Sequence, residues 1–596
     1  MPCLPAAATA WLTARLARGS PTGDDWFAVT TLHRALEGIN VWPDFFQQRT
    51  LHIVPVEAIA THLVYLRLGG DMRWLSALGL VIVALTAWML CRMAAELLPD
   101  STAGQRMLAG TWITLCLFSP LQSETWLWGL CWTLPVPLAA FCTGWFLAQT
   151  HTAVWLRVTG MAFLTATAFL THSGALAVGP CLVLALLLAS DEMIPARRRL
   201  LTAWVVTLIS LGVVLALRFN FHRVRAAAGE SADRAPSVGR MIEGFFALIG
   251  HPVALGTGWQ CTALSLITGG VITAFIGLLT LRVVLVLRRE PRAYAAAPWL
   301  AVGAFGFMNA GMLAVTRAAR SEWPTYTPRY ITLVTPAVLA LVVLLAWASR
   351  TGLLPGSEHR RKQALVAAGA LAFAGILAAW SEGVTWMKLW RTHRLQSEAL
   401  VAFTGTLPMT KLQSVIHNYH ANSIIPPEAK FLQENHALSG TPVFPDAKLS
   451  NLRIAKSALP ASLAGCTRTT RCADGSLLLD GYADFKSKGR PADLVVLTKR
   501  SSQGGEGQVV IAGVVPPCRL DYYRFDPAHL HSSATAAAWT LRVQAADLPA
   551  DDSALELWAI DILQREARAI TPSVDLLTGA PKKPQAEAAS LRQASQ

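Results

Sequence analysis

Two adjacent carboxylates, Asp24 and Asp25, lie in the sequence Thr-Gly-Asp-Asp-Trp near the start of the chain. Where two carboxylates share a partly buried cleft, burial and like charge raise the pKa of one of them, which makes it a proton acceptor. The same residues suit the N-cap of a helix that begins near Trp26, because Asp accepts hydrogen bonds from the first backbone amides. The sequence leaves both roles open, and Asp24 and Asp25 are the candidate catalytic residues.

Arginine and tyrosine side chains precede a late apolar segment. Arg329 would suit bidentate binding of a lipid phosphate. Its alternative role is a headgroup anchor beside Tyr330, since aromatic residues gather at membrane interfaces. Arg317 and Arg320 carry the same two alternatives, so these four residues are candidates for substrate binding.

A carboxylate among tryptophans and a histidine in a tight turn complete the candidate set. Glu124 could hydrogen-bond sugar hydroxyls while the indoles of Trp126 and Trp128 stack on the ring. Tryptophan at this level can equally form a membrane belt. His172, between two closely spaced apolar segments, either lines a cavity or serves as a polar turn residue.

Long apolar segments must position these side chains. The chain has 596 residues, of which 53% are hydrophobic and only 15% charged, and its mean hydropathy is +0.41. Soluble proteins carry about 25% charged residues, so this composition excludes a soluble protein. About 17 to 25 apolar residues cross a bilayer. The clear candidate spans are Leu75–Leu97, Gly129–Gln149, Leu201–Leu217, Cys261–Leu281, Ala295–Val315, Tyr330–Ser349 and Ala364–Trp380; Met107–Phe118, Ala153–Leu170 and Gly174–Ser190 are less cleanly bounded.

Basic clusters orient these segments, because Lys and Arg in short loops mark the cytoplasmic side. The clusters lie at 196–199, 288–292 and 359–362, two spans apart. Their spacing places the candidate residues, and everything after Trp380, on the opposite face. We therefore predict a multi-pass protein of the cell inner membrane whose C-terminal domain is periplasmic. The net charge of +14 comes from such clusters, without a basic face interleaved with aromatics, so we expect no nucleic-acid partner.

The predicted fold is an α-helical polytopic membrane protein of about 10–11 transmembrane helices with a C-terminal extracytoplasmic β-sandwich. Residues 1–74 form an outer N-terminal segment, in which Pro5–Leu16 is too short to span, so the first span is missing or degenerate. Residues 75–380 form the membrane domain, 381–458 a helical and irregular connector, and 571–596 a disordered tail. The β-sandwich covers 459–570, with short β-like runs at 476–479, 494–497, 509–514, 539–543 and 555–562.

Cysteine spacing bears on metals and disulfides. The chain has ten cysteines but no CxxC or Cys/His metal spacing, so we predict no zinc site. Cys466 and Cys472 lie in the polar C-terminal part, where they either close a small disulfide loop or remain free thiols.

Taken together, the outer-face motifs resemble the GT-C class of membrane glycosyltransferases and related bacterial polytopic proteins of largely unassigned chemistry. Where that class would suggest an Asn-Glu-His-Arg sequence, this chain has Gln48-Arg49-Thr50-Leu51-His52. The resemblance rests on the acidic pair, the following helix with His33-Arg34, the Ser119–Gly129 turn with its Glu-Thr-Trp-Leu-Trp sequence, the Thr-His-Ser-Gly turn at 171–174, Pro328-Arg329-Tyr330 and the terminal β-domain.

The resemblance implies transfer of a sugar from a polyprenyl-phosphate donor to an envelope glycan or lipid, in contact with the lipid bilayer. Asp24 or Asp25 would be the base or a metal ligand, which is compatible with a divalent cation, although the cofactor is unknown. An alternative is a non-enzymatic membrane component that binds envelope polysaccharide or helps to export it. A transporter fits less well, because few ionisable groups lie near mid-membrane. The implied substrate-binding residues are His52, Glu124, Trp126, His172, Arg317, Arg320, Arg329 and Tyr330.

Overall fold

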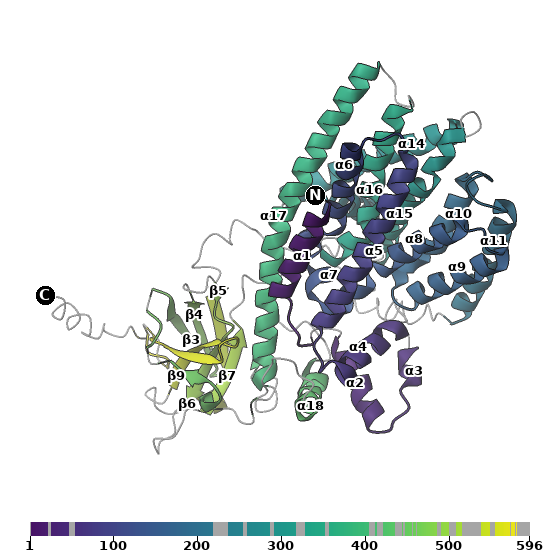
Figure 1. Ribbon diagram of the computed structural model, residues 1–596. Helices are drawn as coiled ribbons and strands as arrows, with labels where there is room; N and C mark the ends of the chain where they lie inside the picture. Colours follow the sequence, from purple (N-terminus) through teal and green to yellow (C-terminus); the bar gives the residue numbers. More distant parts are fainter. Residues whose placement is uncertain are drawn as a thin grey trace.

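The computed structural model shows a bundle of helices followed by a separate β region (Figure 1). The residues that the structure describes are 2–21, 25–46, 54–218, 237–253, 259–286, 291–317, 328–351, 357–403, 412–413, 421–435, 444, 448–455, 457–460, 462–485, 490–499, 508–514, 538–548, 555–572, 574–577 and 580.

Six of the described helices contain stretches long and apolar enough to cross a bilayer: Arg73–Leu97, Gly129–Gln149, Ala263–Leu285, Tyr294–Thr316, Pro328–Arg350 and Gly369–Phe403. Two shorter apolar stretches are Val154–Phe169 and Ser173–Leu188. The helices are α1 Cys3–Leu16, α2 Asp25–Leu36, α3 Trp42–Phe45, α4 Pro55–Arg67, α5 Arg73–Leu97, α6 Ala103–Leu117, η1 Pro120–Gln122, α7 Ser123–Leu127, η2 Gly129–Thr133, α8 Val136–Gln149, α9 Val154–Phe169, η3 Ser173–Ala177, α10 Val178–Leu188, α11 Arg197–Arg218, α13 Val238–Gly250, α14 Trp259–Val286, η5 Pro291–Ala296, α15 Ala297–Arg317, α16 Pro328–Arg350, α17 Glu358–Phe403 and α18 Ala421–Glu434.

Helix α5 shows why these segments belong in lipid. Its buried side includes Val83 and Leu90, which pack into the bundle core. Its exposed side is also apolar, with Leu85 and Trp88 more than half exposed. A helix that is apolar all round needs an apolar environment on its outer side. The structure thus confirms the predicted multi-pass α-helical membrane protein.

The N-terminal helix α1 packs with one face against α5, α6 and α17. Pro5, Thr9 and Thr13 face inward, and the Thr9 hydroxyl donates to the Phe118 carbonyl at 2.5 Å. Its 14 residues rise about 21 Å, which is less than the roughly 30 Å of hydrocarbon in a bilayer. The predicted missing or degenerate first span stays a prediction.

Helix α17 links the bundle to the β region. It runs without a break through 46 residues, Glu358–Phe403, and so continues beyond Trp380. A β-carbon added to Gly383 would lie 2.1 Å from the Leu121 backbone nitrogen, so only glycine lets α17 approach η1 this closely. Helix α18 then packs on α2 at the end of the bundle where α4 also lies (Figure 1).

The described residues of the β region form two sheets, which confirms the predicted C-terminal β-structure. One sheet has the order β1-β7-β6-β9-β10-β2, and the other has the order β3-β4-β5 with β8 also paired to β4. Leu479 and Leu541 of the smaller sheet share a core with Val495 and Leu557 of the larger one. The strands are β1 Leu412–Gln413, β2 Arg453–Ile454, β3 Ala464–Arg471, β4 Leu477–Phe485, β5 Arg490–Pro491, β6 Leu494–Lys499, β7 Gln508–Val514, β8 Ala538–Val543, β9 Leu555–Asp561 and β10 Glu566–Ile570.

Cys466 and Cys472 are both free thiols. Cys466 lies near the start of β3, and Cys472 follows the end of that strand. Six residues of extended strand cover about 20 Å, whereas a disulfide needs Cα atoms within about 7 Å. The disulfide alternative is therefore wrong, and the free-thiol alternative holds.

Candidate functional site

Asp25 is the first residue of α2 and is fully buried. The indole N–H of Trp128 donates to its Oδ1 at 3.2 Å. A carboxylate at a helix N-terminus is stabilised by the helix dipole, and both the capping role and the catalytic role of Asp25 stay predictions. Asp24, its neighbour in the predicted pair, lies outside the described residues.

The same indole contacts Arg329, the first arginine of α16. The guanidinium carbon of Arg329 lies 5.3 Å from the centre of the Trp128 ring and 5.2 Å from that of Tyr330. Its Nη1 donates to Glu124 Oε2 at 2.8 Å. A single indole ring therefore separates Asp25 from Arg329. Four of the predicted residues, Asp25, Glu124, Arg329 and Tyr330, are brought together here.

Glu124 is 1% exposed, and its Oε1 has no hydrogen-bond partner in the described part of the chain. Burial raises the pKa of Glu124, and the nearby Arg329 only partly offsets this effect. Loss of Arg329 would therefore leave the buried Glu124 carboxylate without a compensating charge, which strongly destabilises a protein.

Trp126 and His172 make contacts within the protein that are typical of structural residues. Trp126 is fully buried, stacks on Phe118 at 6.0 Å and donates its N–H to the Ser119 carbonyl at 2.8 Å. Trp128, rather than Trp126, is thus the indole beside the charged residues. His172 precedes η3, where its Nδ1 accepts the Gly174 N–H at 2.9 Å, as expected of a polar turn residue.

Three predicted residues cannot be placed. His52 and Arg320 lie outside the described residues, and Arg317 ends α15 with its side chain outside them too. Among the residues that are described, no three or more His, Cys, Asp or Glu side chains gather closely enough to hold a metal ion.

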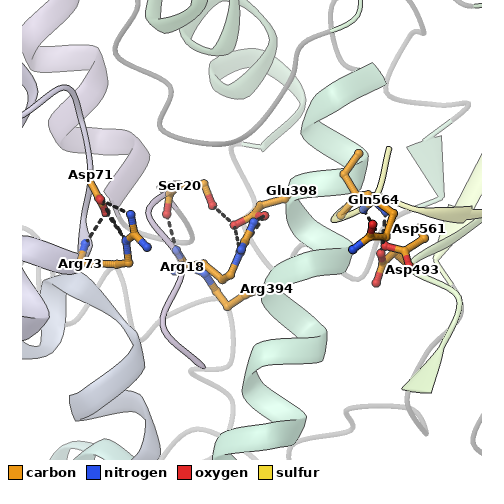
Figure 2. A network of polar contacts seen from close by, with 10 residues as sticks. Arg18, Ser20, Asp71, Arg73, Arg394, Glu398, Asp493, Asp561 and Gln564 are labelled. Carbon is orange, nitrogen blue, oxygen red and sulfur yellow. Dashed lines mark hydrogen bonds and ion pairs between the residues drawn. The ribbon is translucent and has the colours of Figure 1, made fainter. Parts of the chain in front are cut away.

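A second arginine, Arg394 of α17, lies near enough to Asp25 for their charges to interact. It is 1% exposed, and its Nη2 donates to the Ser20 carbonyl (Figure 2). Its Nε and Nη1 are buried without a hydrogen-bond partner among the described residues. Burial opposes the charge of this guanidinium most strongly, and Arg18 opposes it further, whereas Asp25 and Glu398 favour it. A buried donor left unsatisfied costs about 1 to 3 kcal/mol, so two of them on one guanidinium suggest a ligand site.

Glu398, one turn after Arg394, fixes this part of α17 against the N-terminal segment. It accepts from Arg18 Nε at 3.0 and 3.1 Å and from Arg18 Nη2 at 2.6 Å. The Ser20 hydroxyl donates to the same carboxylate at 2.5 Å (Figure 2). Because Glu398 is satisfied by Arg18 and Ser20, the two unpartnered N–H groups of Arg394 stay available.

Tyr65 of α4 adds a neutral donor. It is 5% exposed, and its hydroxyl has no hydrogen-bond partner within the described ranges. Burial raises the pKa of Tyr65 well above its usual value, and the charge of Asp25 raises it further. The phenol thus stays protonated at neutral pH. Asp25, Tyr65 and Arg394 together offer a proton acceptor, a hydroxyl donor and a guanidinium fork suited to a phosphate.

Sequence reasoning missed Tyr65, Arg394 and Glu398. Arg394 and Glu398 are four residues apart and therefore share one face of a helix, but their segment reads as an ordinary solvated helix. Their partners Arg18 and Ser20 are more than 370 residues away in the chain. No pattern in the sequence signals that contact.

Comparison with known proteins gives two distant structural likenesses. No protein-family model matches the chain, and no curated protein matches it in sequence. It is similar to the archaeal oligosaccharyltransferase AglB from Archaeoglobus fulgidus, in complex with an inhibitory peptide and a dolichol-phosphate, at a TM-score of 0.36 and 11% identity, over 74% of this chain and 60% of that one. It is also similar to ArnT from Cupriavidus metallidurans bound to undecaprenyl phosphate, at a TM-score of 0.35 and 16% identity, over 74% of this chain and 89% of that one. The chain thus spans 60% of the length of the archaeal structure.

Proposed function

We propose that this protein is a GT-C-like membrane glycosyltransferase that moves a sugar from a polyprenyl-phosphate donor to an envelope glycan or lipid at the outer face of the cell inner membrane. One observation carries the proposal. The buried guanidinium of Arg394 keeps two N–H groups without partners among the described residues, close to the charge of Asp25. A guanidinium that can bind phosphate, near a carboxylate that can accept a proton, suits a reaction in which a phosphate leaves next to a base.

In the proposed reaction Asp25 accepts the proton of an acceptor hydroxyl. The freed oxygen attacks the anomeric carbon, and the bond from that carbon to the phosphate oxygen breaks. The polyprenyl phosphate leaves with the electron pair and is held by Arg394, with Tyr65 donating a further hydrogen bond. Fixed donors at a site of developing charge stabilise the transition state without reorganisation.

Arg329 has a different part in this proposal from the one favoured by the sequence. Its guanidinium is engaged by Glu124 at 2.8 Å and lies over Trp128. We assign it a positioning role, in which Arg329 holds the indole whose N–H orients Asp25. Trp126 and His172, with their own structural contacts, are not assigned to substrate.

Binding of farnesyl phosphate to the purified protein tests the Arg394 assignment. Farnesyl phosphate should raise the melting temperature of the full chain, whereas farnesol should not. Arg394→Gln should weaken binding about tenfold or more, because a charged hydrogen bond contributes about 1.5 to 3 kcal/mol. Tyr65→Phe removes only an unpartnered hydroxyl, so it should fold normally and bind more weakly. The matched control is Arg92→Gln, which removes an exposed arginine beside Trp88. Equal binding by Arg394→Gln and wild type would overturn the assignment.

Transfer of a radiolabelled sugar from the lipid-linked pool of isolated membranes tests Asp25. Asp25→Asn should lower the rate about 100-fold or more, as expected for loss of a general base, while farnesyl phosphate binding persists. Asp71→Asn, whose partner Arg73 is half exposed, is the control and should transfer normally. Undiminished transfer by Asp25→Asn would contradict the enzyme assignment and favour a non-enzymatic role in binding or exporting polysaccharide.

A further inference from the structure

Helix α4, outside the candidate spans, exposes an apolar stripe and buries polar side chains among apolar ones. Its buried side carries Glu57, Thr61 and His62, which are 3%, 0% and 8% exposed, together with Ala58, Val64 and Tyr65. Its exposed side carries Ile59, Leu63 and Leu66, which are 39%, 54% and 53% exposed. The spacing of four and then three residues places these three side chains in one stripe. Contiguous apolar surface of this kind marks an interaction site for protein or membrane.

The buried polar residues of α4 have partners inside the protein, so the orientation of this helix is built into the fold. The Thr61 hydroxyl donates to Glu57 Oε1 at 3.3 Å. His62 Nε2 lies 2.9 Å from the Ala28 carbonyl and 3.0 Å from the Thr31 hydroxyl. Rotating α4 to bury its leucines would expose the apolar face of α2 and break these bonds. The apolar stripe is thus fixed on the outside.

The stripe of α4 continues onto the lipid-facing surface of α5. The two helices are in contact, and α4 lies at the end of the bundle where α5 begins (Figure 1). The exposed side of α5 starts at Trp74 and continues through Leu78, Val81 and Leu85, all between 39% and 56% exposed. Their spacing keeps them on one helix face, which borders hydrocarbon because α5 spans the membrane.

We infer that α4 is an interfacial helix whose Ile59, Leu63 and Leu66 side chains enter the outer leaflet of the bilayer. Amphipathic helices of this kind bury their apolar face about 5 to 10 Å into the boundary between headgroups and acyl chains. Arg67, at the end of α4, can then reach the headgroups. Tyr65 faces inward from the same helix. Helix α4 thus forms the wall between the leaflet and the buried Asp25–Arg394 cluster, whatever reaction that cluster performs.

Spin labels on single cysteines test this inference in the full-length protein. A Cys3→Ala background removes the exposed native thiol, and the signal of that background is subtracted. Labels at Leu63→Cys and Leu66→Cys are compared in vesicles of phosphatidylethanolamine and phosphatidylglycerol. Leu78→Cys serves as the reference for lipid, and Glu37→Cys, whose side chain is 56% exposed, serves as the reference for water.

Oxygen, which concentrates in lipid, should relax the labels at residues 63 and 66 several-fold more than water-soluble nickel chelate does, as at residue 78. Preferential relaxation by the nickel chelate, as at residue 37, would overturn the inference and show a water-facing helix. Protection from both reagents would also overturn it, since the stripe would then be covered by protein.

Discussion

At the scale of single residues, Trp128 connects two charged groups that the sequence places 304 positions apart, since its N–H holds Asp25 and its ring face holds Arg329. An indole can do both because its donor lies in the ring plane and its electron-rich face attracts cations. The arrangement fixes the orientation of a buried carboxylate without neutralising it. Arg329 in turn contacts Glu124, so the geometry at Asp25 depends on an ion pair whose carboxylate is buried and whose arginine is 29% exposed.

We predict that Arg329→Gln lowers the free energy of unfolding by about 3 to 5 kcal/mol, because it leaves Glu124 buried without its cation. Glu124→Gln combined with Arg329→Gln should recover much of that loss, because neither partner then carries an uncompensated charge. SDS titration of the purified variants in mixed micelles measures this cycle. A loss in the double variant equal to the sum of the losses in Arg329→Gln and Glu124→Gln would show that the pair does not contribute as a unit.

At the scale of elements, α18 is fixed to α2 by a contact that depends on pH. Glu428 lies 3.0 Å from His33 Nδ1, and Phe431 stacks on the same imidazole at 4.1 Å. Burial raises the pKa of Glu428, and Glu37 raises it further; His33 and the Thr30 hydroxyl lower it without cancelling the effect. Because the folded pKa is raised, the stabilisation is complete below the unfolded value and is lost as pH rises through the folded value.

Hydrogen exchange of the α18 amides, corrected for intrinsic rates, should therefore show protection that falls as pH rises from about 4 to about 7. Glu428→Gln should flatten this dependence, since the amide does not titrate. Lys430→Gln, on the exposed side of the same helix at 71% exposure, should leave the dependence as in the wild type. Protection that rises with pH in the wild-type protein would contradict the prediction.

The contact between α17 and η1 allows a matched glycine comparison on one helix. A methyl group at Gly383 would lie 2.1 Å from Leu121 N and 2.4 Å from the Pro120 carbonyl carbon, whereas nothing lies within 4 Å of one at Gly369. Gly383→Ala should cost about 1 to 3 kcal/mol through overpacking. Gly369→Ala should instead stabilise by about 0.5 to 1 kcal/mol. Thermal unfolding in detergent measures both, and equal effects would show that α17 does not press on η1.

The sequence predicted elements far better than contacts. The apolar segments Leu75–Leu97 and Tyr330–Ser349 coincide with α5 and α16, and the runs at 494–497 and 555–562 coincide with β6 and β9. Periodicity and length are local properties, so they can be read from a few neighbouring residues. The sequence placed Asp25 and Arg329 on the same face of the membrane, but it did not decide whether they meet. The place of Arg394 beside Ser20 depends on how α17 crosses the bundle, which no local pattern encodes.

At the scale of the whole molecule, the end of α17 is part of the β-region core. Phe403 is fully buried and meets Phe444 edge-on at 4.9 Å, in a cluster with Val496 and Ile560. Phe403→Ala should cost about 3 to 5 kcal/mol of local stability and make the β region more sensitive to limited proteolysis. Leu377→Ala, at a 47% exposed position on the same helix, is the control. Equal resistance of both variants to protease would show that the helix end does not anchor the sheets.

Because α17 is unbroken, its length also fixes how far the β region is rotated about the helix axis relative to the membrane bundle. Its 46 residues extend about 69 Å, far more than the roughly 30 Å of a hydrocarbon core. Each residue of an α-helix also turns the chain by about 100°. A single residue inserted between Glu398 and Phe403 would therefore rotate the sheets by about a quarter of a turn around the helix axis. The contact between Arg18 and Glu398 would stay in place. The length of α17 thus determines which face of the β region is turned toward the bilayer.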